Sequence, residues 1–266
     1  MPAREPSPGR PAGDDVPADL NPNPALSQVA FDPYRGGALI GQAAALEAHG
    51  HSMVAHQFDD LAQQHEASTL GMWAFLGTEI MFFGGALIGY AVYRHSYYDA
   101  FAAASRMEPW KLGGVNTGIL LCSSLSVALA VYSAQIGSRK GIVRWLLLTI
   151  VFGLAFLSVK GYEYHRLFAE HLVPGVHFDP EREHFPEHLH GSAQIFYGFY
   201  FALTGIHALH MIVGIGIILY IAWLAHRGRF TPEYHNPVEM TGLYWHFVDI
   251  VWIFLYPLLY LVPVRR

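Results

Sequence analysis

The stretch from Met240 to Val262 reads MTGLYWHFVDIVWIFLYPLLYLV. An apolar run of about 20 residues is long enough to cross a bilayer as a helix. His246 and Asp249 nevertheless lie inside it, on the same face of a helix. Ionisable groups are costly in hydrocarbon, so they usually face the protein interior and often mark function. The stretch therefore indicates a membrane helix that carries enclosed polar groups.

Four other windows have the same apolar character and a spanning length. The complete set of predicted spans is 70–94, 113–136, 142–167, 193–224 and 240–262. Only helices and closed barrels satisfy their backbone in lipid, and continuous apolar runs of this length are typical of helices. The window at 193–224 exceeds the bilayer thickness, which indicates a tilt or an extension into water. The predicted fold is all-α, a polytopic membrane bundle of five transmembrane helices.

The composition agrees with a membrane protein and excludes nucleic acid as a partner. The chain is 53% hydrophobic and only 14% charged, whereas soluble domains are nearer a quarter charged. Its net charge of −5 provides no basic surface for nucleic acid. The single cysteine, Cys122, excludes a disulfide within the chain.

The sequence divides into a polar amino-terminal arm, residues 1–66, and a membrane domain, residues 67–266. Residues 1–36 are rich in Pro, Gly and Asp, a composition that predicts disorder, and they lack the apolar core of a signal peptide. Residues 37–66 are too short and too interrupted to span. Positive charges in the compact loops 137–144 and 225–239 favour a cytoplasmic amino terminus and a carboxyl terminus on the opposite side.

Glu79 lies near the middle of the first predicted span, with Thr78 as its only polar sequence neighbour. Desolvation disfavours a charged carboxylate, so the neutral acid is expected there. Two interpretations remain open. Glu79 is either a structural hydrogen-bonding group or a site that exchanges protons.

Lys160 and Glu163, near the end of the third span, are within pairing distance on one helical face. A structural ion pair is the favoured interpretation, although Lys160 could instead pair with an acid on another helix, such as Glu79. A small transporter built around these three groups is a further alternative.

His207 and His210 are one turn apart in the fourth span, and His246 lies in the fifth. Such histidines can ligate haem or a metal, so a freestanding haem-binding membrane protein is a distant alternative. We expect instead that they form hydrogen bonds that hold the fourth span to the fifth, with no metal bound. The irregularly spaced histidines of loop 165–190 predict a solvated loop with weak metal affinity.

Several motifs resemble subunit III of the haem–copper (cytochrome c) oxidases. They occur in the order of that family and together cover about residues 68–262. The motifs are GTEIMFFG at 77–84, NTGILLCSS at 116–124, YEY at 162–164, TGIHALHMIVG at 204–214 and YWHFVDIVWIFLY at 244–256.

The resemblance implies a non-catalytic accessory subunit of a proton-pumping terminal oxidase in a bacterial inner membrane. Family members pack on subunit I, support its proton uptake and stability, and hold phospholipid. The haems and copper are in subunits I and II, so no cofactor is expected in this chain. Glu79 would be the carboxylate that reacts with carbodiimide. Glu163, His207, His210, His246 and Asp249 would be contacts within the bundle.

This sequence departs from the family pattern at its amino-terminal end. The family fold has seven helices, and the first two have no counterpart in the polar segment 1–66. The chain therefore resembles the short five-helix bacterial form, and another subunit or lipid would take the place of the missing pair. Quinol oxidases and nitric oxide reductase systems contain similar short proteins, so the electron donor stays open, with cytochrome c preferred.

Overall fold

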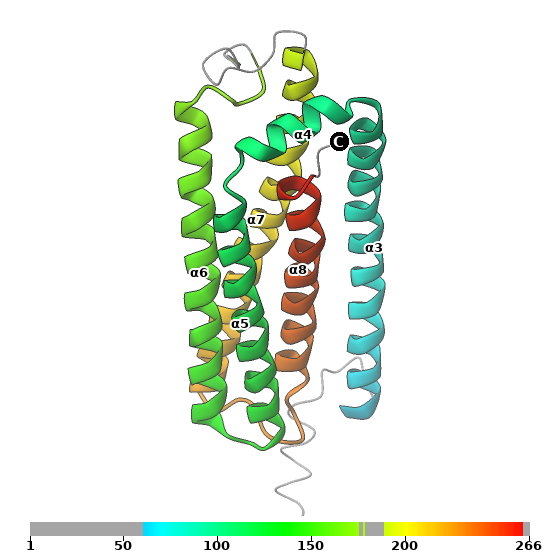
Figure 1. Cartoon of the computed structure of the whole chain (residues 1–266). Coiled ribbons are helices and arrows are strands. Elements are labelled where there is room, and N and C mark those ends of the chain that lie inside the picture. The colour runs from blue at the N-terminus through cyan, green and yellow to red at the C-terminus, as the bar shows by residue number, and fades with distance from the viewer. Residues whose placement is uncertain (1–60, 176–177, 179–188, 263–266) are drawn as a thin grey trace, which may run out of the picture. The chain divides into compact units, whose positions relative to one another are not determined.

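The computed structural model describes residues 61–175, 178 and 189–262. Over these residues the chain forms six helices (Figure 1), which are α3 (Leu61–Ser96), α4 (Tyr98–Met107), α5 (Trp110–Gln135), α6 (Arg139–Ala169), α7 (His190–His226) and α8 (Asn236–Tyr260). Five of them, all except α4, are long and apolar enough to cross a membrane. The prediction of an all-α polytopic bundle with five transmembrane helices is confirmed.

The helix α8 is the centre of this bundle. Within its most apolar window 56% of the residues are buried, against 17% in α3. It packs against α5, α7 and α3, while α5 pairs with α6 and α6 with α7. The turn between α5 and α6 contains Gly137 at φ +71°, a conformation that side chains with a Cβ rarely adopt. Four helices thus form a close-packed group, and α3 lies against its side (Figure 1).

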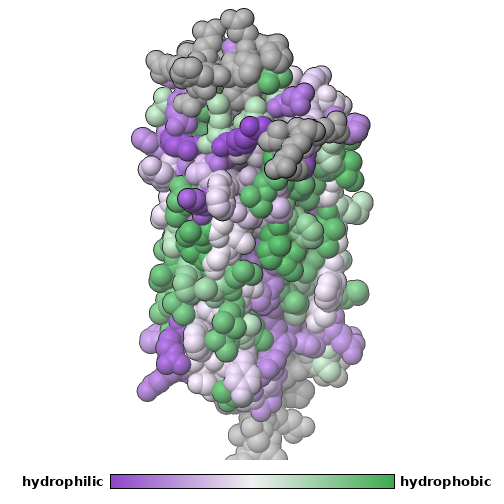
Figure 2. Space-filling view, in the orientation of Figure 1, coloured by the Kyte–Doolittle hydropathy of each residue, from purple (hydrophilic) through white to green (hydrophobic). Residues whose placement is uncertain are grey.

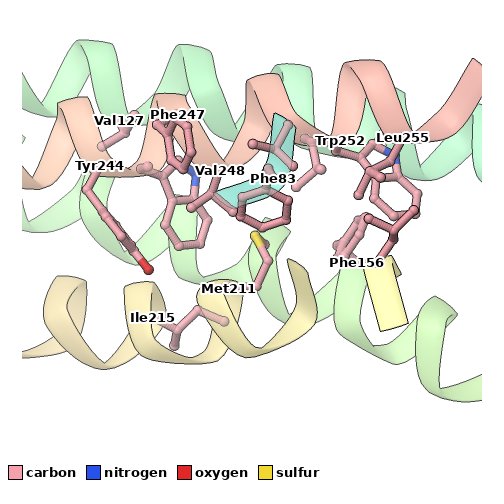
Figure 3. Close-up of a cluster of buried hydrophobic side chains, with 14 of the residues drawn as sticks. Phe83, Val127, Phe156, Met211, Ile215, Tyr244, Phe247, Val248, Trp252 and Leu255 are labelled. Atoms are coloured by element: carbon pink, nitrogen blue, oxygen red, sulfur yellow. The ribbon is translucent and has the colours of Figure 1, made fainter. Parts of the chain in front are cut away.

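Large aromatic side chains of α8 fill the core between the helices. Trp245 and Trp252 are both fully buried, and Trp252 meets the ring of Phe156 edge-on at 4.8 Å (Figure 3). The indole of Trp245 donates a hydrogen bond to Ser123 Oγ at 2.9 Å. Its ring lies against Gly153 and Gly214, where an added Cβ would come within 3.0 Å of ring atoms. These glycines let α6 and α7 approach α8 closely.

The outer surface of the bundle is apolar over its central band. In Figure 2 hydrophobic residues cover the middle of the visible face and hydrophilic residues gather toward both ends. Large exposed apolar side chains occur on every spanning helix, among them Met81, Leu125, Val151, Leu219 and Phe254. Such a belt is unfavourable in water and is expected of a protein whose solvent is the bilayer.

Two local features differ from the sequence-based expectations. The helix α4 was not predicted, because its ten residues are too few for a span; it packs on α7 through Phe101, whose ring is 5.5 Å from that of Phe196. The helix α3 begins at Leu61, inside the segment assigned to the arm. Residues 1–60 of that arm, and 176–177 and 179–188 of the histidine-rich loop, lie outside the described residues.

The remaining span boundaries agree with the predicted windows to within a few residues. The predicted over-long window is α7, which has 37 residues. At about 1.5 Å per residue this helix exceeds the ~30 Å of hydrocarbon, so it must tilt or extend beyond the apolar core at its ends.

Candidate functional site: polar groups enclosed between the helices

Glu79 of α3 meets His210 of α7 across the groove between these helices. Glu79 Oε2 lies 3.2 Å from His210 Nε2, and the two side chains are 19% and 18% exposed. The other ring nitrogen of His210, Nδ1, lies 2.9 Å from the carbonyl oxygen of Ile206. Because a carbonyl can only accept a hydrogen bond, Nδ1 carries a hydrogen.

The geometry leaves two arrangements in which the Glu79–His210 pair is neutral overall. With Nδ1 protonated, Nε2 of a neutral imidazole is an acceptor, so Glu79 must be the acid that donates to it. If the proton moves to Nε2, an imidazolium faces a carboxylate instead. In both arrangements Glu79 and His210 share one proton and carry no net charge, which is the form that an apolar setting favours.

The walls around the Glu79–His210 pair are apolar. The pair borders a cavity of about 370 Å³ that is lined mainly by hydrophobic side chains, including Met72, Phe75 and Val213. The ring of Phe83 lies 5.3 Å from the His210 ring. Glu79 is therefore enclosed at the contact of α3 with the close-packed group, and Thr78 is turned to its own helix, where it donates to Phe75 O at 2.7 Å.

Lys160 and Glu163 form the ion pair that the sequence predicted. Lys160 Nζ lies 2.6 Å from Glu163 Oε2, and the two residues are 3% and 1% exposed. Lys160 Nζ also donates to the hydroxyls of Tyr200 and Tyr260, each at 2.9 Å. Those hydroxyls lie 3.1 and 2.8 Å from the same Glu163 oxygen. The pair thus connects α6 to α7 and α8, and the alternative pairing of Lys160 with Glu79 is not formed.

His246 and Asp249 of α8 face α5. His246 Nδ1 lies 2.7 Å from Ser124 Oγ. Asp249 is 3% exposed, and neither of its oxygens has a well-formed hydrogen bond to the described residues, with Ser124 as the hydroxyl beside it. The contact made by His246 joins the predicted second and fifth spans, so the expectation that it holds the fourth span to the fifth is wrong.

His207 is fully buried, and neither ring nitrogen has a hydrogen-bond partner among the described residues. Its ring packs between those of Phe156 and Trp252, at centroid distances of 5.4 and 5.1 Å. The expectation of a hydrogen bond from His207 to the fifth span is therefore wrong as well. It contacts that span by ring packing against Trp252, because the neighbouring positions are occupied by aromatic side chains.

The three histidines that raised the possibility of haem or metal ligation have three separate settings. His210 pairs with Glu79, His246 with Ser124, and His207 lies among aromatic rings. Within the part of the chain that the structure describes, no group of three or more His, Cys, Asp or Glu side chains has metal-binding geometry.

One buried acid that sequence reasoning does not single out is Glu108. It follows α4 and precedes Pro109, a position typical of a solvated loop. Its side chain is 0% exposed, and the nearest cation is Arg166 of α6, with Nη2 3.6 Å from Oε2. Burial raises the pKa of Glu108 to about 7, against the opposing effects of Arg166 and Lys160.

Comparisons with known proteins agree with the motif resemblance. The family model described as cytochrome c oxidase subunit III matches residues 59–171 and 183–263. A cytochrome c oxidase subunit 3 from Synechocystis sp. is 32% identical over 81% of this chain and 80% of that protein. A cytochrome bo(3) ubiquinol oxidase subunit 3 from Pseudomonas putida is 31% identical over 75% and 87%. A quinol oxidase subunit 3 from Bacillus spizizenii is 30% identical over 80% and 95%.

The matched segments contain all five spanning helices and every enclosed polar residue described above. The chain belongs to the subunit III family of the haem–copper (cytochrome c) oxidases.

Proposed function

We propose that this chain is a non-catalytic accessory subunit of a proton-pumping haem–copper oxidase in aerobic respiration. In this role it packs on subunit I, supports proton uptake and stability there, and works in a complex whose haems and copper belong to partner subunits. Family membership over the whole described bundle is the observation that carries the proposal. Reduction of oxygen needs redox metals, so this chain contributes position and insulation.

A lipid-holding role is supported by the groove between α3 and α8. This groove has a volume of about 470 Å³ and almost entirely apolar walls, formed by side chains such as Ile80, Phe83, Phe247 and Phe254. At membrane depth, apolar walls of this kind suit the acyl chain of a phospholipid. The Glu79–His210 pair borders a separate cavity next to this groove and is the candidate for exchange of a proton.

The central experiment separates an accessory subunit from a freestanding haem protein. An affinity-tagged chain is purified once from native membranes and once after expression without its partners. We expect haem-bearing chains to co-purify in the first case and no Soret band in the second. A Soret band that belongs to the chain expressed alone would overturn the proposal.

Cytochrome c is our first candidate for the electron donor of the complex. Relatives named cytochrome c oxidase and relatives named quinol oxidase match this chain at similar identity, so quinol is the second candidate. Oxygen consumption by the purified complex, measured with reduced cytochrome c and then with a quinol, distinguishes the two.

The proposed orientation places the beginning of α3 at the cytoplasm and the end of α8 on the opposite side. Single cysteines at Ser96 and Lys140, both exposed and at opposite ends of the bundle, test it in a chain whose Cys122 is replaced by Ser. A membrane-impermeant maleimide applied to spheroplasts should label Ser96→Cys and leave Lys140→Cys unlabelled. The reverse pattern would invert the orientation.

A further inference from the structure

The buried acid Glu108 differs from Glu79 and Glu163 because no donor among the described residues satisfies it. Both of its oxygens are buried without a hydrogen-bond partner among the described residues. Arg166 stays at 3.6 Å and uses Nη2 to donate to Met107 O at 3.3 Å. A structural ion pair in a buried place requires close hydrogen bonds on its charged oxygens, and Glu108 has none.

Glu163 of α6, which is close enough to act on Glu108 electrostatically, does have hydrogen-bond donors. Its Oε2 accepts from Lys160 Nζ at 2.6 Å and lies within hydrogen-bond distance of two tyrosine hydroxyls. These donors come from three helices, α6, α7 and α8. The two neighbouring acids therefore differ in their surroundings, since Glu163 is held by several donors and Glu108 by none among the described residues.

The charges around Glu108 come from one helix and the residue after it. Arg166, Lys160 and Glu163 of α6, and Glu170 directly after α6, act on Glu108 electrostatically. Tyr200 of α7 and Tyr260 of α8 complete its titratable surroundings. With Glu108 ionised, the two positive charges of Lys160 and Arg166 equal the two negative charges of Glu108 and Glu163. Uptake of one proton by Glu108 therefore leaves one positive charge in excess, with Glu170 nearby.

The side chains next to Glu108 reach the surface of the bundle. The side chains of Arg166 and Glu170 are 27% and 30% exposed and lie 3.5 Å apart. They are near the end of α6, at the end of the bundle where α4 lies (Figure 1). Arg166, 3.6 Å from Glu108, thus joins the buried acid to a partly exposed pair of side chains.

We propose that Glu108, together with Arg166 and the Lys160–Glu163 pair, forms an exchangeable proton-binding site that communicates with water at the α4 end of the bundle. The step is a simple protonation, in which a proton from water adds to a Glu108 oxygen and the carboxylate becomes a carboxylic acid. The pKa of Glu108, raised to about 7 by burial, allows the site to fill and empty near neutral pH. The site lies away from Glu79 and does not depend on the proposed electron donor.

Infrared spectroscopy of the purified complex tests this site directly, because only a protonated carboxyl shows the carboxylic-acid C=O stretch. The difference between wild type and Glu108→Gln, recorded from roughly pH 5 to pH 9, isolates one group. We expect a single carboxylic-acid band that disappears with a midpoint near pH 7. The exposed acid Glu233 at the other end of the bundle provides the control, and Glu233→Gln should titrate as the wild type does.

A second variant keeps the test decisive if Glu108→Gln does not assemble, because pH-difference spectra of the wild type and of Arg166→Gln can be compared directly. Arg166→Gln removes the nearest cation, so the midpoint should move upward by about one pH unit or more. A merely structural Glu108 gives no titrating band and hence no shift. The absence of a titrating carboxyl in the wild-type difference spectrum, or a midpoint unchanged by Arg166→Gln, would overturn the proposal.

Discussion

The enclosed polar residues fall into two kinds, those that connect helices and those that do not. Lys160, Glu163 and His246 each have a hydrogen-bonding partner on another helix. Asp249 and His207 are equally buried without one among the described residues. The first kind stabilises the bundle, because removal of one partner leaves the other buried and unsatisfied. Asp249 carries no such argument, and His207 is held by ring contacts with its aromatic neighbours.

The Glu79–His210 pair gives the first prediction at this scale. Glu79→Gln should change thermal stability little, because an amide can still donate to His210 Nε2. Glu79→Leu should cost about 1 kcal/mol, since the ring nitrogen loses its partner in a place that is only partly enclosed. Thermal unfolding of the detergent-solubilised complex measures both. Equal stability of the two variants would show that the hydrogen bond contributes nothing.

Lys160 leads to a larger expected effect. Lys160→Met leaves the Glu163 carboxylate without its cation and should destabilise the complex by about 3–5 kcal/mol. Adding Glu163→Gln to that variant should restore part of the loss, because the uncompensated charge is removed. Lys140→Met, at an exposed position of the same helix, is the matched control. A double variant no more stable than Lys160→Met alone would contradict the pairing argument.

The contacts of some of these residues could be predicted from the sequence and those of others could not, for a physical reason. The Lys160–Glu163 pair was predictable because helical geometry alone brings residues three apart together. The partner of Glu79 was not, since it depends on the depth at which α3 meets α7. The same holds for Ser124 beside His246. Glu108 was missed because a loop acid becomes buried only when α4 folds over the end of the bundle.

At the scale of elements, close approach of α6 and α7 to α8 depends on two glycines that accommodate one indole ring. Trp245 lies between Gly153 and Gly214, and both positions lack room for a Cβ. Packing of this kind is rigid because dense interiors cannot absorb an added methyl group without moving side chains or backbone. The glycines are therefore part of the fit between helices.

Gly214 and Gly216 on α7 form a matched pair of test positions. Gly214→Ala places a Cβ 3.0 Å from the rings of Tyr244 and Trp245 and should cost about 1–3 kcal/mol. At Gly216 nothing lies within 4 Å of an added Cβ, so Gly216→Ala should be neutral or stabilise by up to about 1 kcal/mol. Unfolding midpoints of both variants decide the matter, and a tolerated Gly214→Ala would refute the close-packing account.

The five spans were readable from the sequence because each combines length with continuous apolar character. The helix α4 was not, since its ten residues give too short a pattern. Its stability comes from burying Phe101 against α7 and from the contact of Ser105 Oγ with the backbone of Val262 at 3.3 Å. Contacts between distant parts of the chain stabilise such short helices, and a local sequence pattern does not predict these contacts.

At the scale of the whole molecule, the bundle is asymmetric. Four helices enclose the polar network, whereas α3 is the least buried span and contributes exposed apolar residues such as Ile80, Met81 and Ile88. A helix held by one side only is expected to gain further contacts from lipid or a neighbouring subunit in the bilayer. The position of Glu79 on this helix would make its pairing with His210 sensitive to what covers α3.

The pH dependence of stability is a property of the whole molecule in which Glu108 should be visible. In the folded chain burial raises the pKa of Glu108 from 4.5 to about 7. Between these values the folded protein holds a proton that the unfolded chain has released. The stability contributed by this group is therefore complete below about pH 4.5, declines as the pH rises to about 7, and changes no further above it.

Glu108→Gln removes this contribution and should make the variant gain stability relative to the wild type as the pH rises. The expected gain between pH 5 and pH 7 is on the order of 1–3 kcal/mol, because Gln stays neutral where the buried acid is forced to ionise. Thermal unfolding of both complexes across this range measures the difference, and other titrating groups cancel in it. Parallel profiles would mean that Glu108 has the same proton affinity in the folded and unfolded chain, and a gain toward acidic pH would mean that Arg166 stabilises its charged form.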